Sequence, residues 1–126
     1  MVILDSSVVI AIFKDSDVHH EKAKEIFYRE DDLVIPTCAL IEILSILKMK
    51  KGLDAVQKCT EFIYNAENID IYEISNQLVD EAIQFYIKHK NNLSFTDTLL
   101  LALSNKTKIP LITFDQELAK IAAKNS

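Results

Sequence analysis

Four carboxylates stand in or beside apolar segments of this 126-residue chain, where an isolated charge is costly. They are Asp5 after Val2-Ile3-Leu4, Glu42 within residues 38–44, Asp97 before residues 99–103, and Asp115 after residues 110–114. Such acids are tolerated when they are paired or bind a metal, and all-oxygen ligands select Mg²⁺ or Mn²⁺ rather than zinc. The sequence carries no Gly-rich phosphate loop and no Ser-His-Asp set. The chemistry that suits these residues best is therefore metal-assisted hydrolysis of a phosphodiester.

Each acid also has a simpler interpretation. Asp115 and Asp5 could cap the helices that follow them, and Asp97 could complete a capping box with Ser94. Glu42 has no capping role, because it stands inside an apolar helical segment with Ser45 as its polar companion. One shared site explains four such acids more economically than four separate accidents, and we expect an acidic cluster.

The elements that must position these acids alternate along the chain. Strands are expected at residues 2–4, 33–35, 69–72 and 111–113. Helices are expected at residues 6–13, 17–30, 37–51, 54–66, 75–90, 94–106 and from 115 onward, with caps at Thr37, Ser75 and Ser94. Short strands separated by helices predict a parallel sheet covered on both faces, with ligands outside the strands' carboxyl ends. Asp5 and Asp115 fall at such ends, whereas Asp97 follows a helix, so spacing alone leaves its position open.

Composition narrows the function further. A net charge of −5 and a pI near 5.1 argue against a broadly basic nucleic-acid surface, but not against a nuclease whose cations supply the positive charge. The basic stretch at residues 48–51 is either a solvated helix end or a phosphate-contacting rim. No apolar run approaches the ~20 residues that span a bilayer, and no basic region precedes Asp5. With Cys38 and Cys59 interpreted as reduced core residues, a cytoplasmic protein without a membrane segment or signal peptide is expected.

Four segments together resemble the PIN-domain ribonucleases, and in particular the VapC-type toxins of type II toxin–antitoxin systems. They are Leu4-Asp5-Ser6-Ser7-Val8-Val9-Ile10, Glu42 in its apolar helix, Ser94-Phe95-Thr96-Asp97-Thr98, and Leu111-Ile112-Thr113-Phe114-Asp115. The resemblance covers essentially the whole chain, in order and spacing. It implies a single PIN-like domain over residues 1–126, a three-layer α/β/α sandwich with a central parallel sheet. Many relatives continue into a short edge strand, so four or five strands are expected.

The resemblance also implies a function. Asp5, Glu42, Asp97 and Asp115 would be the catalytic residues and would bind Mg²⁺ or Mn²⁺, with hydroxyl support from Ser6, Ser7 and Thr113. The expected activity is endonucleolytic cleavage of RNA by a toxin that forms a homodimer and is inhibited by a cognate antitoxin protein. Because Arg29 is the one arginine of the sequence, RNA contacts would fall to lysines and backbone amides. The alternative is a catalytically silent PIN-like module that binds RNA or a protein.

Overall fold

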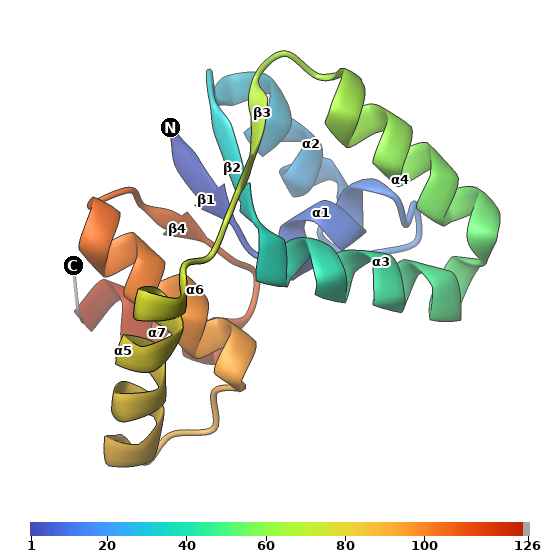
Figure 1. Ribbon diagram of the computed structural model, residues 1–126. Coiled ribbons are helices and arrows are strands. Elements are labelled where there is room, and N and C mark those ends of the chain that lie inside the picture. Colours follow the sequence, from blue (N-terminus) through green and yellow to red (C-terminus); the bar gives the residue numbers. More distant parts are fainter. Residues whose placement is uncertain (125–126) are drawn as a thin grey trace.

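The computed structural model describes residues 1–124 and alternates strands with helices (Figure 1). The strands are β1 (Val2–Leu4), β2 (Leu33–Pro36), β3 (Ile69–Tyr72) and β4 (Leu111–Ile112). The helices are α1 (Ser6–Ile12), α2 (His20–Arg29), α3 (Thr37–Lys51), α4 (Leu53–Asn65), α5 (Asn76–Lys88), α6 (Phe95–Thr107) and α7 (Gln116–Lys124).

The four strands form one parallel sheet in the order β3-β2-β1-β4. Ile3 pairs with Val34 of β2 on one side and with Leu111 of β4 on the other, so β1 is a central strand. The predicted fold class, a three-layer α/β/α sandwich on a parallel sheet, is confirmed. Of the four or five strands expected, residues 1–124 form four.

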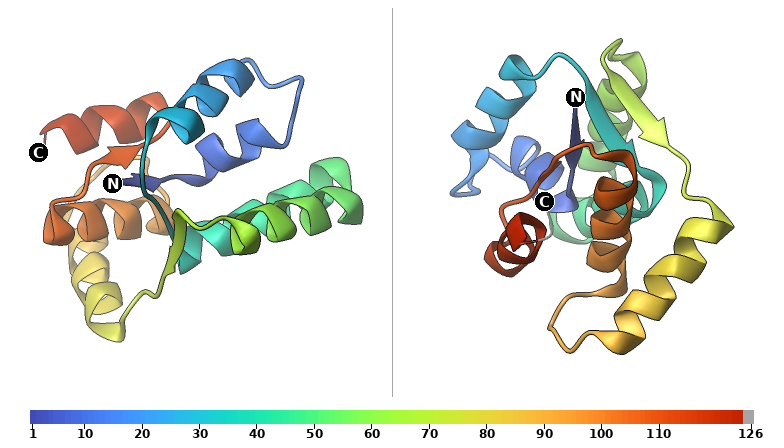
Figure 2. Two further views of the ribbon diagram at one scale, coloured as in Figure 1. Left: turned by 90° about the horizontal axis from the view of Figure 1, so that it is seen from above. Right: turned by 90° about the vertical axis from the view of Figure 1, so that its left-hand side faces the viewer.

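Helices cover both faces of the sheet. Both views of Figure 2 place α2 and α7 on one side and α5 and α6 on the other. The helices α3 and α4 run antiparallel and project beyond the carboxyl end of β2 (Figure 1). They are joined at Gly52, whose φ of 91° lies in a region that residues with a Cβ rarely adopt.

The apolar core surrounds β1 and stabilises its central position in the sheet. Ile3 and Leu4 are fully buried, as are Val8 and Val9 of α1 and Leu100 of α6. Burying each such side chain contributes roughly 1.5–3 kcal/mol relative to leaving it exposed. A central, fully buried strand ends at Leu4, and the residue that follows it is therefore positioned by the core itself.

The predicted helix caps are right at two positions and wrong at one. The hydroxyls of Ser75 and Ser94 accept hydrogen bonds from the backbone amides of Leu78 and Asp97, as capping residues do. Thr37, expected to cap α3, is instead its first residue, because the N-cap is Pro36 at the end of β2. The Thr37 hydroxyl donates to the Tyr72 carbonyl at 3.0 Å and so ties the start of α3 to the end of β3. Within residues 1–124, no helix has the length and apolar character needed to cross a membrane.

Candidate functional site

Asp5 lies directly beyond β1 and is 3% exposed. Its Oδ2 accepts hydrogen bonds from the hydroxyls of Thr113 at 2.5 Å and Ser7 at 2.9 Å. The Ser6 hydroxyl lies 3.3 Å from Oδ1. These hydroxyls supply the polar partners that a buried carboxylate requires. Asp5 also occupies the N-cap position of α1, yet its side chain makes no capping hydrogen bond, so the capping interpretation is wrong.

Glu42 reaches the same place from α3. The Ser6 hydroxyl donates a short hydrogen bond to Glu42 Oε1, which places this oxygen and Asp5 Oδ1 on either side of one serine. The polar companion expected within α3, Ser45, is exposed and donates to the Ile41 carbonyl at 2.8 Å. The long-range contact with Ser6 therefore decides where Glu42 points, and Glu42 and Asp5 belong to one site.

Asp97 takes part in the N-cap of α6 and also lies near other acids. Its amide donates to the Ser94 hydroxyl at 3.1 Å, as the capping interpretation requires. The pKa of its half-buried carboxyl is raised to about 6, first by burial and then by the negative charges of Asp5 and Asp115, whereas hydrogen bonds with Ser94 lower it. The carboxyl of Asp97 is therefore within electrostatic range of Asp5 and Asp115, which settles the position that spacing left open.

Asp115 lies beyond β4 and is exposed. Its Oδ1 accepts the Leu118 amide at 3.0 Å, so it caps α7 as its simpler interpretation holds. Its own amide donates to the Thr113 hydroxyl at 3.0 Å, and Thr113 in turn donates to Asp5. Capping and membership of the acidic edge are thus compatible for this residue.

The structure brings all four acids to the carboxyl edge of the sheet, but their side chains are not arranged as a complete set of metal ligands. Among residues 1–124, no three His, Cys, Asp or Glu side chains lie so that together they could hold a metal ion. Three of the acids accept hydrogen bonds from protein donors, since Asp5 and Glu42 accept from hydroxyls and Asp115 accepts from the Leu118 amide. The ion pairs of the described part of the chain involve other acids, Glu21, Glu30 and Glu81. Carboxylates and hydroxyls without a basic partner form an oxygen donor set that fits Mg²⁺ or Mn²⁺.

Three residues near this edge carry no signal in the sequence. Cys38 stands one helical turn before Glu42, and burial raises the pKa of its thiol to about 11, with smaller contributions from the charges of Glu42 and Asp5. His19 is exposed and its ring stacks on Phe114, with ring centroids 4.5 Å apart and planes at 20°. These contacts join residues that are remote in sequence, and periodicity says nothing about them.

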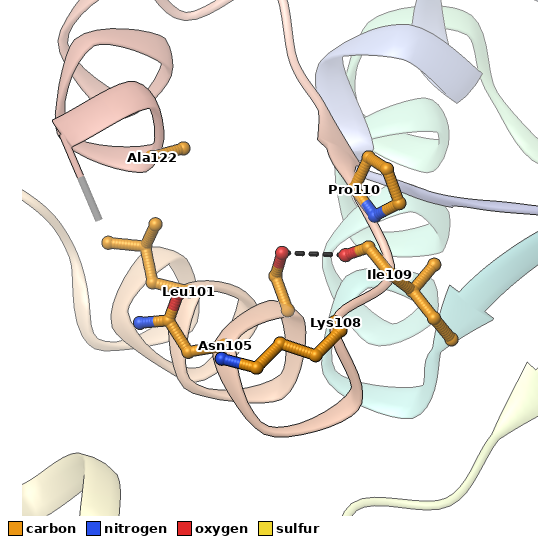
Figure 3. Close-up of a pocket in the computed structure, with 7 residues that line it drawn as sticks. Leu101, Asn105, Lys108, Ile109, Pro110 and Ala122 are labelled. Carbon is orange, nitrogen blue, oxygen red and sulfur yellow. Dashed lines mark hydrogen bonds between the residues drawn. The ribbon is translucent and has the colours of Figure 1, made fainter. Parts of the chain in front are cut away.

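A separate hollow lies at the opposite end of β4. Figure 3 shows its lining residues, Leu101, Ser104, Asn105, Lys108, Ile109, Pro110 and Ala122. The Ser104 hydroxyl donates to the Ile109 carbonyl at 2.6 Å, the dashed line in the figure, and fixes the turn that leads into β4. The hollow precedes β4, whereas Asp115 follows it, and no acid lines it. It is therefore distinct from the carboxylate edge and lacks groups for hydrolysis.

Comparisons with known proteins identify a family and a fold. Residues 2–124 match the PIN domain family. No curated protein matches the chain. Among solved structures, the chain is similar to Mycobacterium tuberculosis VapC20, a sarcin-ricin loop cleaving toxin, with a TM-score of 0.88 at 18% identity over 96% of this chain and 95% of that one. It is also similar to FitAcB from Neisseria gonorrhoeae, with a TM-score of 0.70 at 11% identity over 98% of this chain and 94% of that one.

Proposed function

The chain belongs to the PIN domain family, and on that premise we propose that it is a metal-dependent endoribonuclease and the toxin of a toxin–antitoxin pair. The observation that carries the proposal is the convergence of acids at one sheet edge. Asp5 and Glu42 share the Ser6 hydroxyl, and the charges of Asp5 and Asp115 raise the pKa of Asp97. The fold of VapC20, a toxin that cleaves the sarcin-ricin loop, supports the same proposal.

Each residue of the site has a definite part in this proposal. Asp5, Glu42, Asp97 and Asp115 would hold Mg²⁺ or Mn²⁺ through carboxylate oxygens. When bound, such an ion supplies Lewis acidity for hydrolysis of a phosphodiester. Ser7 and Thr113 fix the orientation of the Asp5 carboxylate from two different elements. Ser6 holds Asp5 and Glu42 at a common spacing, and Asp115 fixes the start of α7 beside them.

The test is cleavage of a mixed RNA pool by the purified protein with Mg²⁺ or Mn²⁺. Controls are an excess of chelator, the Asp97→Asn variant, and Asp80→Asn, which removes an exposed acid of α5 outside the site. We expect cuts with the parent protein and Asp80→Asn, and none with chelator or Asp97→Asn. Cleavage that persists in Asp97→Asn would refute the assigned site.

The biological part of the proposal has its own test. We propose a cytoplasmic protein that forms a homodimer, acts on RNA and is held inactive by a cognate antitoxin. The PIN family match and the VapC20 likeness support the toxin role. Expression of the chain alone should slow bacterial growth, and Asp97→Asn should restore it at equal protein level. Normal growth at confirmed expression of the parent chain would refute the toxin role and leave the nuclease chemistry standing.

One observation favours a second candidate function, a catalytically silent module that binds RNA or protein. No three potential ligands of the described residues lie together around a common cation position. A calorimetric titration of the purified protein with Mn²⁺ separates the two. Saturable binding that Asp97→Asn weakens supports the nuclease, whereas absent binding together with absent cleavage supports the silent module.

A further inference from the structure

We propose that the stacked rings of His19 and Phe114 form a base-stacking subsite for a nucleotide of single-stranded RNA beside the carboxylate edge. The inference rests on the proposed nuclease function and adds to it the part of the RNA that the protein binds, a nucleobase. The two ring centroids are 4.5 Å apart and the planes differ by 20°. His19 is exposed, so its outer face is open to a nucleobase while Phe114 supports its inner face. Aromatic side chains bind single-stranded nucleic acid through such stacking, largely irrespective of base identity.

A hydrogen bond from the backbone of Phe114 fixes the position of the pair relative to the acids. The Phe114 amide donates to the Ser7 hydroxyl at 3.1 Å, and that hydroxyl donates to Asp5 Oδ2 at 2.9 Å. Two successive hydrogen bonds therefore connect Phe114 to Asp5, the most buried of the four acids. Phe114 also stands between Thr113 and Asp115 in the chain. A base stacked on His19 would thus belong to a nucleotide close to the bond that is cleaved.

The segment that carries His19 is ordered before any ligand arrives. The His19 amide donates to Asp17 Oδ1 at 2.8 Å, and the ring of the next residue, His20, bonds to the Ala11 carbonyl through Nδ1 at 2.6 Å. Because the backbone is held on both sides, little ordering remains to oppose binding.

The negative net charge of the chain makes a stacking contact useful for binding RNA. The net charge is −5 and Arg29 is the sole arginine, so the general attraction to phosphates that basic proteins use is weak. Stacking on an aromatic ring supplies affinity that does not depend on the net charge of the protein. The competing explanation is that the pair only clamps the loop between α1 and α2 onto the exit of β4.

The experiment measures binding rather than cleavage, in an Asp97→Asn background with Mg²⁺ present. The probes are a fluorescent oligo(A) and an oligomer of equal length that lacks bases. We expect His19→Ala to weaken oligo(A) binding by roughly 5- to 100-fold and to leave the base-free oligomer unchanged. His19→Phe, which keeps a flat ring and carries no charge, should retain the affinity, and His19→Lys should not restore it. All variants should melt within a few degrees of one another.

The outcomes separate this inference from the proposed function. Equal binding by His19→Ala and its parent, rescue by His19→Lys but not by His19→Phe, or an unfolded His19→Ala together with weak binding by His19→Phe would each overturn the subsite. No binding of oligo(A) by the parent would overturn it as well. Cleavage by the chain with Asp97 intact is assayed in parallel. Base-dependent binding without any cleavage would refute the nuclease and leave the subsite standing.

Discussion

The hydroxyl of Thr113 donates to Oδ2 of Asp5 at 2.5 Å, across 108 positions of the chain. The same Thr113 oxygen accepts the Asp115 amide at 3.0 Å and lies 3.5 Å from the Ser7 hydroxyl oxygen. One side chain at the exit of β4 therefore sets the position of Asp5 at the exit of β1 and of Asp115 at the start of α7. The register between β1 and β4 therefore determines how the carboxylates of Asp5 and Asp115 are placed.

Thr113→Val should separate this orienting role from simple packing, because valine keeps the shape and removes the hydroxyl. We expect an affinity for Mn²⁺ lower by about 10- to 100-fold, since groups that orient metal ligands contribute at that level. Stability should fall by about 1–3 kcal/mol, because Asp5 is buried and loses its closest donor. Thr113→Ser keeps the hydroxyl and should bind Mn²⁺ as the parent does. Equal titration curves for the two variants would show that the hydroxyl has no such role.

Asp97→Asn should abolish cleavage and, in metal-free protein at neutral pH, raise the melting temperature by roughly 2–5 °C. Burial and the charges of Asp5 and Asp115 raise the pKa of this carboxyl from 3.8 to about 6, so its ionisation opposes folding. Asparagine removes that charge and can still accept a hydrogen bond through its carbonyl oxygen. Mg²⁺ should stabilise the parent protein and have little effect on the variant. A lower melting temperature for Asp97→Asn would mean that the carboxylate is a structural group.

The stabilisation by Asp97→Asn should depend on pH in a defined direction. An acid whose pKa is raised in the folded state binds its proton more tightly there than in the unfolded state. The stability that this proton binding adds is fully present below pH 3.8 and is lost as the pH rises through about 6. The melting temperatures of parent and variant should therefore converge at low pH and diverge across this interval. Asp80→Asn, at an exposed position of α5, is the control and should show no such divergence. A difference that is constant with pH would contradict the assigned cause.

Asp5→Asn should behave in the opposite sense, although it too removes a charge from the cluster. Oδ2 of Asp5 accepts from the hydroxyls of Ser7 and Thr113, and the charge of the carboxylate strengthens both bonds. The single proton of the Ser6 hydroxyl goes to Glu42, so Ser6 is a neighbour of Oδ1 at 3.3 Å and not a further donor to it. Asparagine can keep both partners through its amide oxygen, but it replaces two charge-assisted hydrogen bonds with weaker neutral ones. We expect a loss of about 1.5–3 kcal/mol in urea unfolding of the metal-free protein. Unchanged or increased stability would show that repulsion among the acids outweighs these bonds.

The sequence predicts the sheet well because β1 and β2 are short, fully apolar and bounded by polar residues. Every residue of Val2–Leu4 and Leu33–Pro36 is buried, and such runs are typical of parallel strands covered on both faces. Helix starts are less certain. Thr37 has the chemistry of a cap, but Pro36 occupies that position, and the Tyr72 carbonyl from a distant strand takes the Thr37 hydroxyl. Propensity cannot anticipate a partner that tertiary structure supplies.

The site divides in the same way. That Asp5 and Asp115 lie at one sheet edge follows from where their strands end, so the sequence suffices for it. The family resemblance implies that Glu42 and Ser6 belong to one site, but spacing does not show their direct contact, which joins α3 to α1. The pairing of His19 with Phe114 likewise depends on how the loop before α2 folds back over β4. Topology predicts which residues share an edge, and packing decides which side chains meet there.

The two cysteines provide a readout of cation binding that does not require RNA. Burial raises the pKa of both thiols to about 11, and for Cys38 the charges of Glu42 and Asp5 contribute in addition. Mg²⁺ at the carboxylates would offset those charges, and each unit by which the Cys38 pKa falls gives about tenfold more thiolate. We therefore expect Mg²⁺ to accelerate iodoacetamide labelling of Cys38, measured by mass spectrometry at mildly alkaline pH.

Cys59 is the internal control for this labelling, because burial alone raises the pKa of its thiol. Its rate reports any general opening of the protein, and the ratio of the two rates isolates the electrostatic effect. Asp97→Asn should reduce the acceleration at Cys38, since it removes one of the proposed ligands. Equal acceleration of both cysteines would indicate loosening of the fold, and an unchanged ratio at saturating Mg²⁺ would place the cation away from Glu42 and Asp5.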